Sequence, residues 1–380
     1  MTPDPSLQMV DLKGQYLRIK EEIDAAVMDV LTSSAFIDGP QVARFAAHLA
    51  AYLGVPHVVP CANGTDALQI AFMALGLTAG DEVIVPAFTY AATAEAAALL
   101  GLVPVMVEVD PHNFNLLPCA LEKAWSPKTK AVVPVHLFGQ CAPMKSIMEW
   151  AKARGIFVVE DAAQALGATY LEPPYKGQRA GTIGDIGCTS FFPSKNLGCF
   201  GDGGALITKE AEWAARFKMI AHHGQQKKYV HKVLGCNSRL DTLQAAILEV
   251  KLNYLDQYEA ARYRAAQYYT QGLQDMIGII SPRQESYSTH VYHQYTLRVL
   301  NGRRDDLQRH LAASEIPSTI YYPLPLHQQE AFASVARISD SLAVSERLCG
   351  EVLSLPMHTE LTLEVQQKII KQIRNFFDHI

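Results

Sequence analysis

Short apolar runs alternate with longer, helix-like segments through the first half of the chain. The strand-like runs cover residues 82–86, 103–109, 131–135 and 156–161. Between them, residues 91–100, 117–125 and 144–154 repeat apolar positions at helical spacing. This alternation predicts a mostly parallel sheet covered by helices on both faces. In sheets of this kind, ligands bind beyond the carboxyl ends of the strands.

The pattern on either side of this region is mainly helical. Residues 11–31 and 42–53 have helical periodicity, and so do residues 241–255 and the segment that continues to about 273. Further along, residues 294–299 are strand-like, and 304–314 and 366–377 are helix-like. We therefore expect a large domain over residues 1–255 and a smaller α+β domain over residues 256–380.

Composition places the chain among globular proteins with a large core. Its 380 residues are 49% hydrophobic and 19% charged. A net charge of −5 argues against nucleic acid as a partner, because a basic excess is needed to displace counterions from phosphates. The apolar stretch 91–107 is interrupted by Glu95, Gly101 and Pro104, so no membrane span is expected there. The first residues lack the basic and apolar regions of a signal peptide.

The cysteines and histidines give no metal or disulfide pattern. Seven scattered cysteines, an odd number, fit reduced thiols in the cytoplasm. His222, His223 and His231 cluster without the spacing of metal ligands, so we expect no metal site.

The first candidate for chemistry is Lys195, which stands among Phe191, Phe192, Pro193 and Leu197. Apolar surroundings remove a lysine from water and lower its pKa toward the nucleophilic amine that a Schiff base needs. The alternative is a lysine whose stem packs on aromatic rings while its head reaches water. Taken alone, this stretch favours the alternative.

Two further sites would explain such a lysine. A helix is expected to open near Asn63 or Thr65, and the N–H groups of its first turn could hold a phosphate. An ordinary capped helix is the alternative. Asp161 ends a strand-like run, where its carboxylate could pair with a cationic ring nitrogen or simply cap a helix.

Two loops complete the candidates. Residues 222–238 are polar and locally basic, which fits a solvated loop or a segment that reaches a diphosphate or a neighbouring subunit. Residues 321–327 form an aromatic loop of the kind that lines a cleft.

Together these segments resemble the DegT/DnrJ/EryC/StrS family of sugar aminotransferases. The resemblance rests on residues 63–68, 80–84, 86–90, 134–140, 160–164, 190–195 and 237–241, taken in that order. It implies the fold type I of pyridoxal-phosphate-dependent transferases, in which a large domain holds a mostly parallel seven-stranded sheet and a smaller α+β domain follows. The implied cofactor is pyridoxal 5'-phosphate.

The resemblance also implies a role for each matching residue. Lys195 would form the Schiff base with the cofactor and move protons, and Asp161 would pair with the pyridine nitrogen. Gln164 would lie near the ring hydroxyl, and Tyr90 would stack on the ring. The phosphate would be held by Gly64, Thr65 and Ser190, together with Asn237 from the second subunit of a homodimer with shared active sites.

Within the family, residues 187–195 and 223–225 look most similar to aminotransferases of UDP-2-acetamido-3-keto-glucuronate. This implies glutamate as donor, a UDP-linked keto sugar as acceptor, and a place in bacterial surface polysaccharide biosynthesis, including lipopolysaccharide O-antigen. Arg239, Tyr322 and His327 match positions that would contact the sugar nucleotide. A guanidinium suits a carboxylate, although Arg239 could equally form a structural ion pair with Asp241 or with another acid.

Other functions remain as alternatives. Related sugar dehydratases have histidine where this chain has Lys195, which argues against dehydration. Amination at carbon 4 of a UDP- or dTDP-linked keto sugar is one alternative. A second is a cofactor-binding regulatory protein without turnover, and a third is a transaminase for small metabolites. The insert at residues 171–174 departs from the family's usual short hairpin.

Overall fold

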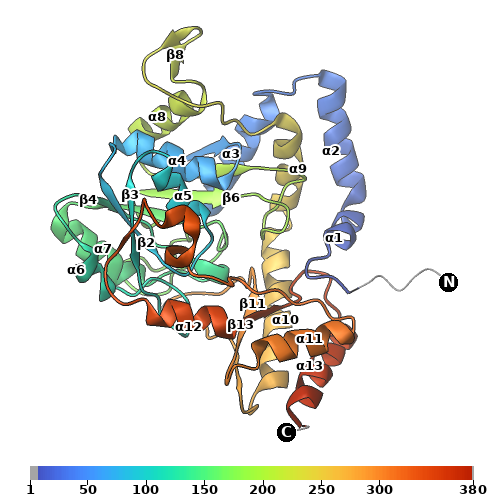
Figure 1. The fold of residues 1–380 in the computed structure, drawn as a ribbon. Coiled ribbons are helices and arrows are strands. Elements are labelled where there is room, and N and C mark those ends of the chain that lie inside the picture. Colours follow the sequence, from blue (N-terminus) through green and yellow to red (C-terminus); the bar gives the residue numbers. More distant parts are fainter. Residues whose placement is uncertain (1–6, 379–380) are drawn as a thin grey trace.

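The computed structural model describes residues 7–378, which form a large α/β layer above a smaller helical and antiparallel layer (Figure 1). The main sheet has eight strands in the order β1-β7-β6-β5-β4-β2-β3-β12. Their bounds are β1 His57–Cys61, β2 Glu82–Pro86, β3 Val103–Val107, β4 Thr129–Val132, β5 Phe157–Asp161, β6 Ile186–Ser190, β7 Gly204–Thr208 and β12 Arg337–Ile338. β7 runs antiparallel to both neighbours, and the other strand pairs are parallel.

Helices cover both faces of this sheet, as the alternating pattern predicts. One face packs against α4 Gly64–Leu75, α5 Ala92–Ala98 and α8 Ala211–Ala221. The other packs against α6 Ala120–Ala124 and α7 Met144–Arg154, and at its β1 end against α3 Pro40–Leu53 and α9 Thr242–Leu252. Successive residues of β2 alternate between the two cores: Val83 and Val85 belong to the first and Ile84 to the second. Burial on both faces explains why these strands are apolar throughout.

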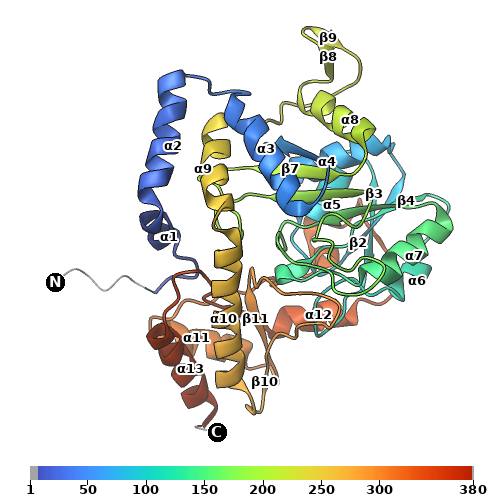
Figure 2. The same ribbon diagram turned by 180° about the vertical axis from the view of Figure 1, so that it is seen from behind.

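Seven strands of the sheet come from residues 57–208, and the mostly parallel arrangement is confirmed. The eighth strand, β12, comes from the C-terminal third of the chain and pairs with β3 at the edge. The helix expected over 11–31 is divided at Ile19 into α1 Leu12–Arg18 and α2 Lys20–Ser33. The loop expected over 222–238 contains a short hairpin of β8 Gln225–Lys227 and β9 Val230–His231, which projects from the large layer (Figures 1 and 2).

The C-terminal part of the chain has a core of its own. α10 Leu255–Leu273 continues nearly in line with α9 and descends from the large layer into the small one (Figure 2). There it packs with α11 Arg304–Ala313 and α13 Leu363–Asp378 against the antiparallel sheet of β10 Ile279–Ile280, β11 Tyr295–Val299 and β13 Val352–Leu355. α12 Ala343–Glu351 lies between the layers. We propose the domain boundary at residue 255, with β12 as the segment that returns to the large sheet.

Short 3-10 helices complete the described chain, over Leu137–Gly139, Leu326–Gln328 and Glu330–Phe332. Within residues 7–378, no helix is both long enough and apolar enough to cross a membrane. The same residues contain no group of three or more histidine, cysteine, aspartate or glutamate side chains that could hold a metal ion.

Candidate active site

A cavity of about 810 Å³ lies at the carboxyl ends of β2, β4, β5 and β6. Eight of the eleven residues predicted for the site line it: Gly64, Thr65, Tyr90, Asp161, Gln164, Ser190, Lys195 and Tyr322. Asn237, Arg239 and His327 of the same chain do not. Residues far apart in the sequence therefore meet where the topology of a parallel sheet places a ligand.

Lys195 lies in a tight loop that follows β6. Its backbone N–H donates to Phe192 O at 2.8 Å, and the backbone N–H of Cys199 closes the loop on Phe191 O at 2.8 Å. Burial lowers the pKa of the Lys195 ammonium to about 8, although Asp161 opposes the shift by favouring the charged form. An amine with this pKa is partly neutral near physiological pH, and the neutral form is the nucleophile.

A second buried lysine forms a hydrogen bond to the same loop. Lys251 of α9 is buried, and its Nζ donates to the carbonyl oxygen of Gly198. Burial lowers the pKa of Lys251 to about 8 as well. Lys251 does not line the cavity, so a lowered pKa alone does not distinguish the two lysines, whereas position does.

Asp161 ends β5 with its carboxylate in the cavity and two hydrogen bonds fixing it. Thr93 Oγ1 donates to Oδ2 at 2.8 Å, and the backbone N–H of Ala163 donates to Oδ1 at 3.1 Å. Thr93 was not predicted. It is fully buried on α5 in a run of alanines, and a polar residue in such a run is the signal that could have found it.

Gln164 has its amide orientation fixed by its neighbours. The backbone N–H of Phe138 donates to Gln164 Oε1 at 2.9 Å, which leaves Nε2 to donate to Tyr322 Oη at 3.1 Å. Nε2 carries two hydrogens, so it retains a second donor next to the cavity. Burial raises the pKa of Tyr322, which keeps the phenol protonated.

The N-terminus of α4 lies at the cavity and packs closely against the end of β6. Asn63 caps α4 by accepting from the backbone N–H of Asp66 at 2.8 Å. The first N–H groups of the helix have no intrahelical partner. A Cβ on Gly64 would lie 2.8 Å from Ser190 Cβ, and one on Gly204 would lie 2.4 Å from the backbone of Asn63. The strand end and the helix start are therefore packed together at a point where only glycine fits.

These residues fit pyridoxal phosphate. The helix N-terminus suits a phosphate, Asp161 suits a protonated ring nitrogen, and Lys195 suits an aldehyde. Two buried polar atoms of cavity residues, Thr89 Oγ1 and His293 Nδ1, have no protein partner. Buried polar atoms are rarely left unpaired, so these two indicate a polar ligand in the cavity. Neither residue was predicted from the sequence.

Aromatic side chains form the open side of the cavity. Tyr90 is 61% exposed, and its ring centroid lies 6.2 Å from that of Tyr322. Phe192 also lines the cavity and is 53% exposed. Exposed aromatic rings at a cavity entrance are available to a ring-shaped ligand or to another protein surface.

The three remaining predicted residues lie elsewhere in the chain. Asn237 is exposed beside the base of the hairpin, where its strand segment pairs with His222. Arg239 stands two residues further on and is half-buried. Among the ion pairs of the described residues, none joins Arg239 to Asp241, the pair that the sequence left open. His327 Nε2 donates to Glu346 Oε1 at 3.0 Å, outside the cavity lining.

Comparison with known proteins identifies similar sequences over nearly the whole chain. The DegT/DnrJ/EryC1/StrS aminotransferase family matches residues 17–374. A Pseudomonas aeruginosa protein named UDP-2-acetamido-2-deoxy-3-oxo-D-glucuronate aminotransferase is 47% identical, covering 93% of this chain and 96% of its own. A Geobacillus stearothermophilus protein named pleiotropic regulatory protein is 44% identical, covering 98% and 99%.

A solved structure extends the similarity to three dimensions. The Streptomyces venezuelae protein DesV, crystallised in complex with a ketimine intermediate, superposes with a TM-score of 0.95 at 40% identity. The match covers 99% of this chain and the whole of DesV. The described chain and DesV therefore share one fold.

Proposed function

Because the chain belongs to the DegT/DnrJ/EryC1/StrS family of pyridoxal-phosphate-dependent sugar aminotransferases, we propose that it transfers an amino group from glutamate to UDP-2-acetamido-2-deoxy-3-keto-glucuronate. The product would be the 3-amino sugar, used in bacterial surface polysaccharide biosynthesis such as that of lipopolysaccharide O-antigen. The observation that carries the transaminase chemistry is the meeting of Lys195, Asp161 and the α4 N-terminus in one cavity. The 47% identity to the P. aeruginosa enzyme supports the choice of sugar.

We assign the cofactor's parts to residues of the cavity. Gly64, Thr65 and Ser190 hold the phosphate at the α4 N-terminus, and Tyr90 stacks on the ring. Gln164 donates to the ring hydroxyl through its free Nε2 hydrogen. Asp161 accepts from the ring nitrogen, a charge-assisted bond worth about 1.5–3 kcal/mol.

The protein's part in the reaction is to bind, orient and move protons. When bound, pyridoxal phosphate supplies an aldehyde that carries the amino group and a ring that withdraws electrons. Lys195 provides the amine that holds the aldehyde. When its Nζ is free, Lys195 would move a proton between the amino-bearing carbon of the donor and the aldehyde carbon of the cofactor, and a positioned base of this kind contributes about 10²–10⁴ in rate. Asp161 keeps the ring nitrogen protonated throughout.

A homodimer with shared active sites completes the cavity in this proposal. Asp66, Asp161 and Asp202 line it with Lys195, the one lysine or arginine among the described lining residues. The cofactor phosphate and a sugar diphosphate together need more positive charge than this lysine offers. The basic hairpin β8–β9 projects from the large layer (Figure 2). In the proposed dimer, its flank with Asn237 and Arg239 would face the cavity of the partner subunit.

Substrate recognition is assigned to three residues. Arg239 of the partner subunit would bind the sugar carboxylate, because a guanidinium matches a carboxylate with two parallel hydrogen bonds. Tyr322 would contact the sugar beside Gln164. His327 would contribute after a movement of its loop, since it now pairs with Glu346. The free cysteines among the described residues support a location in the reducing cytoplasm.

A second candidate is a cofactor-binding regulatory protein, which the name of the G. stearothermophilus relative favours. The two functions can be distinguished by whether the protein turns over substrate. We would incubate the cofactor-loaded protein with glutamate and a panel of UDP- and dTDP-linked sugars oxidised at carbon 3 or carbon 4, and detect products by mass spectrometry. The proposal expects 2-oxoglutarate and amination of the UDP-3-keto-glucuronate in preference to the others. Preference for a carbon-4 ketone or a dTDP sugar would reject the substrate, and absence of any turnover would favour the regulatory function.

A further inference from the structure

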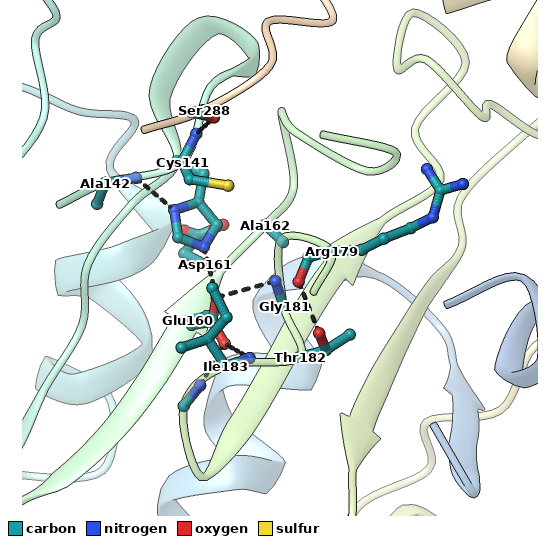
Figure 3. A network of polar contacts seen from close by, with 12 residues as sticks. Cys141, Ala142, Glu160, Asp161, Ala162, Arg179, Gly181, Thr182, Ile183 and Ser288 are labelled. Atoms are coloured by element: carbon teal, nitrogen blue, oxygen red, sulfur yellow. Dashed lines mark hydrogen bonds and ion pairs between the residues drawn. The ribbon is translucent and has the colours of Figure 1, made fainter. Parts of the chain in front are cut away.

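A buried carboxylate lies directly behind the one that faces the cavity. Glu160 precedes Asp161 on β5, so the two side chains project to opposite faces of the sheet. Glu160 is 0% exposed. Its Oε2 accepts from the backbone N–H of Gly181 at 2.9 Å, and its Oε1 accepts from those of Ile183 and Gly184, each at 2.6 Å (Figure 3).

The fourth donor to Glu160 is His136, whose Nε2 lies 2.7 Å from Oε2. The other ring nitrogen, Nδ1, accepts from the backbone N–H of Ala142 at 2.9 Å, so it cannot carry a hydrogen (Figure 3). The hydrogen therefore resides on Nε2 and is donated to Glu160, which makes His136 a neutral imidazole with a fixed tautomer. Burial raises the pKa of Glu160, but His136 and the N–H groups of Gly184 and Gly181 outweigh it and hold the pKa below its usual value.

The pair is connected to two of the predicted cofactor residues, Asp161 and Gln164, through a short piece of backbone. The backbone N–H of His136 donates to Asp161 O at 3.0 Å, and that of Asp161 donates to Pro134 O at 2.9 Å. Two residues after His136, the N–H of Phe138 orients Gln164. A shift of His136 would therefore move the end of β5 and the partner of Gln164 together.

Stability alone does not explain such an arrangement. A buried polar pair is often no more stabilising than apolar side chains of the same volume, because both groups lose their hydration. What four directed hydrogen bonds do supply is a fixed geometry. In a transaminase, that geometry matters at Asp161, where a small displacement weakens the bond to the ring nitrogen.

We propose that Glu160 and His136 are positioning residues that hold Asp161 and Gln164 in register with the cofactor, a role that rests on the proposed function. They touch neither cofactor nor substrate. They fix the junction of β5, residues 134–138 and the turn at 181–184, and the carboxylate of Asp161 takes its direction from that junction.

The test uses two substitutions of one residue. His136→Asn keeps an acceptor for Ala142 but leaves Glu160 without its side-chain donor, whereas His136→Gln keeps that donor and leaves Ala142 unpaired. Thr182→Val is the matched control. It changes the same turn, where Thr182 Oγ1 donates to Arg179 O at 2.7 Å, without removing a contact to Glu160 (Figure 3). Asp161→Asn reports the complete loss of the carboxylate.

Each holoenzyme is loaded with pyridoxal phosphate labelled with ¹⁵N in its ring, and the nitrogen's chemical shift is followed against pH. We expect His136→Asn to deprotonate the nitrogen at lower pH than the wild type and to lose about 10- to 100-fold in kcat with a smaller change in KM. His136→Gln should lie between it and the wild type. Thr182→Val should lower Tm while leaving the nitrogen signal unchanged.

The outcomes separate this proposal from the assignment of Asp161. If Asp161→Asn changes the nitrogen signal and His136→Asn does not, Asp161 is the ring partner and the positioning role is wrong. If Asp161→Asn also leaves the signal unchanged, the proposed role of Asp161 fails and the positioning role fails with it. If His136→Asn and His136→Gln lose Tm and kcat in parallel and keep the wild-type nitrogen signal, the positioning role is also wrong. His136 then contributes only to the stability of the fold.

Discussion

Gln164 Nε2 donates to Tyr322 Oη at 3.1 Å, which joins two residues 158 positions apart in the chain. One follows the strand end that carries Asp161, and the other belongs to the aromatic loop between the small layer and β12. The contact links Gln164, which is assigned to the cofactor, to Tyr322, which is assigned to the substrate. A substitution at Tyr322 should therefore be felt at Gln164.

Tyr322→Phe removes the acceptor of the Gln164 amide and keeps the aromatic ring. We expect a loss of about 0.5–1.5 kcal/mol, the net value of one hydrogen bond, seen as a decrease of about twofold to twelvefold in kcat/KM. Tyr321→Phe is the control. Tyr321 also lines the cavity, but its hydroxyl makes no hydrogen bond to the described residues. Equal losses in the two variants would show that the Gln164 contact has no special weight.

Lys195→Ala should remove the group that borohydride reduction attaches to the cofactor. After reduction, wild-type protein should carry the cofactor covalently on the peptide with Lys195, as read by mass spectrometry. Lys251→Met is a matched control, because burial lowers the pKa of Lys251 to about 8 as well, but its Nζ donates to Gly198 O and the residue does not line the cavity. A reducible adduct in Lys195→Ala, or its absence in a folded Lys251→Met, would contradict the assignment.

The rate at which the apoprotein captures pyridoxal phosphate should rise with pH. Burial lowers the pKa of Lys195 from 10.5 to about 8, and only the neutral amine attacks an aldehyde. The capture rate should therefore increase through pH 8 and level off well below pH 10.5. Stopped-flow absorbance of the apoprotein at constant ionic strength measures this. A midpoint near 10.5 would mean that the lysine is not desolvated.

Gly64→Ala should weaken cofactor binding. The new Cβ would lie 2.8 Å from Ser190 Cβ, so the α4 N-terminus and the end of β6 must separate at the point assigned to the phosphate. Gly350→Ala is the control. It lies within α12 with no atom within 4 Å of the added carbon, and alanine there should stabilise by up to about 1 kcal/mol. Fluorescence titration with pyridoxal phosphate gives the two dissociation constants, and unchanged affinity in Gly64→Ala would reject the phosphate site.

The sequence predicted the strands and the groups at their ends better than it predicted contacts. β2, β3 and β5 are recognisable because each is apolar on both faces, and the residue that ends β5 is Asp161. β1 was missed because His57 and Pro60 interrupt its apolar pattern, which an edge strand tolerates.

Contacts made by tertiary packing leave no periodic signal. Thr93 reaches Asp161 only because α5 packs on the sheet next to the end of β5. His293 enters the cavity from the segment before β11, in a region that the pattern assigns to the small domain. The roles implied by resemblance for Asn237, Arg239 and His327 stay predictions, since a single chain does not bring them to the cavity.

The shared active site can be tested by mixing subunits. Lys195→Ala and Asn237→Ala each disable one contribution to a site, and in the proposed dimer these two contributions come from different chains. A mixed dimer then contains one site with both defects and one with neither, so a mixture of two inactive homodimers should regain about a quarter of wild-type activity at equal concentrations. The control is a mixture of Lys195→Ala with Asp161→Asn, because these residues line the same cavity of one chain and each mixed site keeps a defect. Recovery in the first mixture and none in the second, assayed after exchange in mild denaturant, is the expected result; recovery in neither would place Asn237 within its own chain's site.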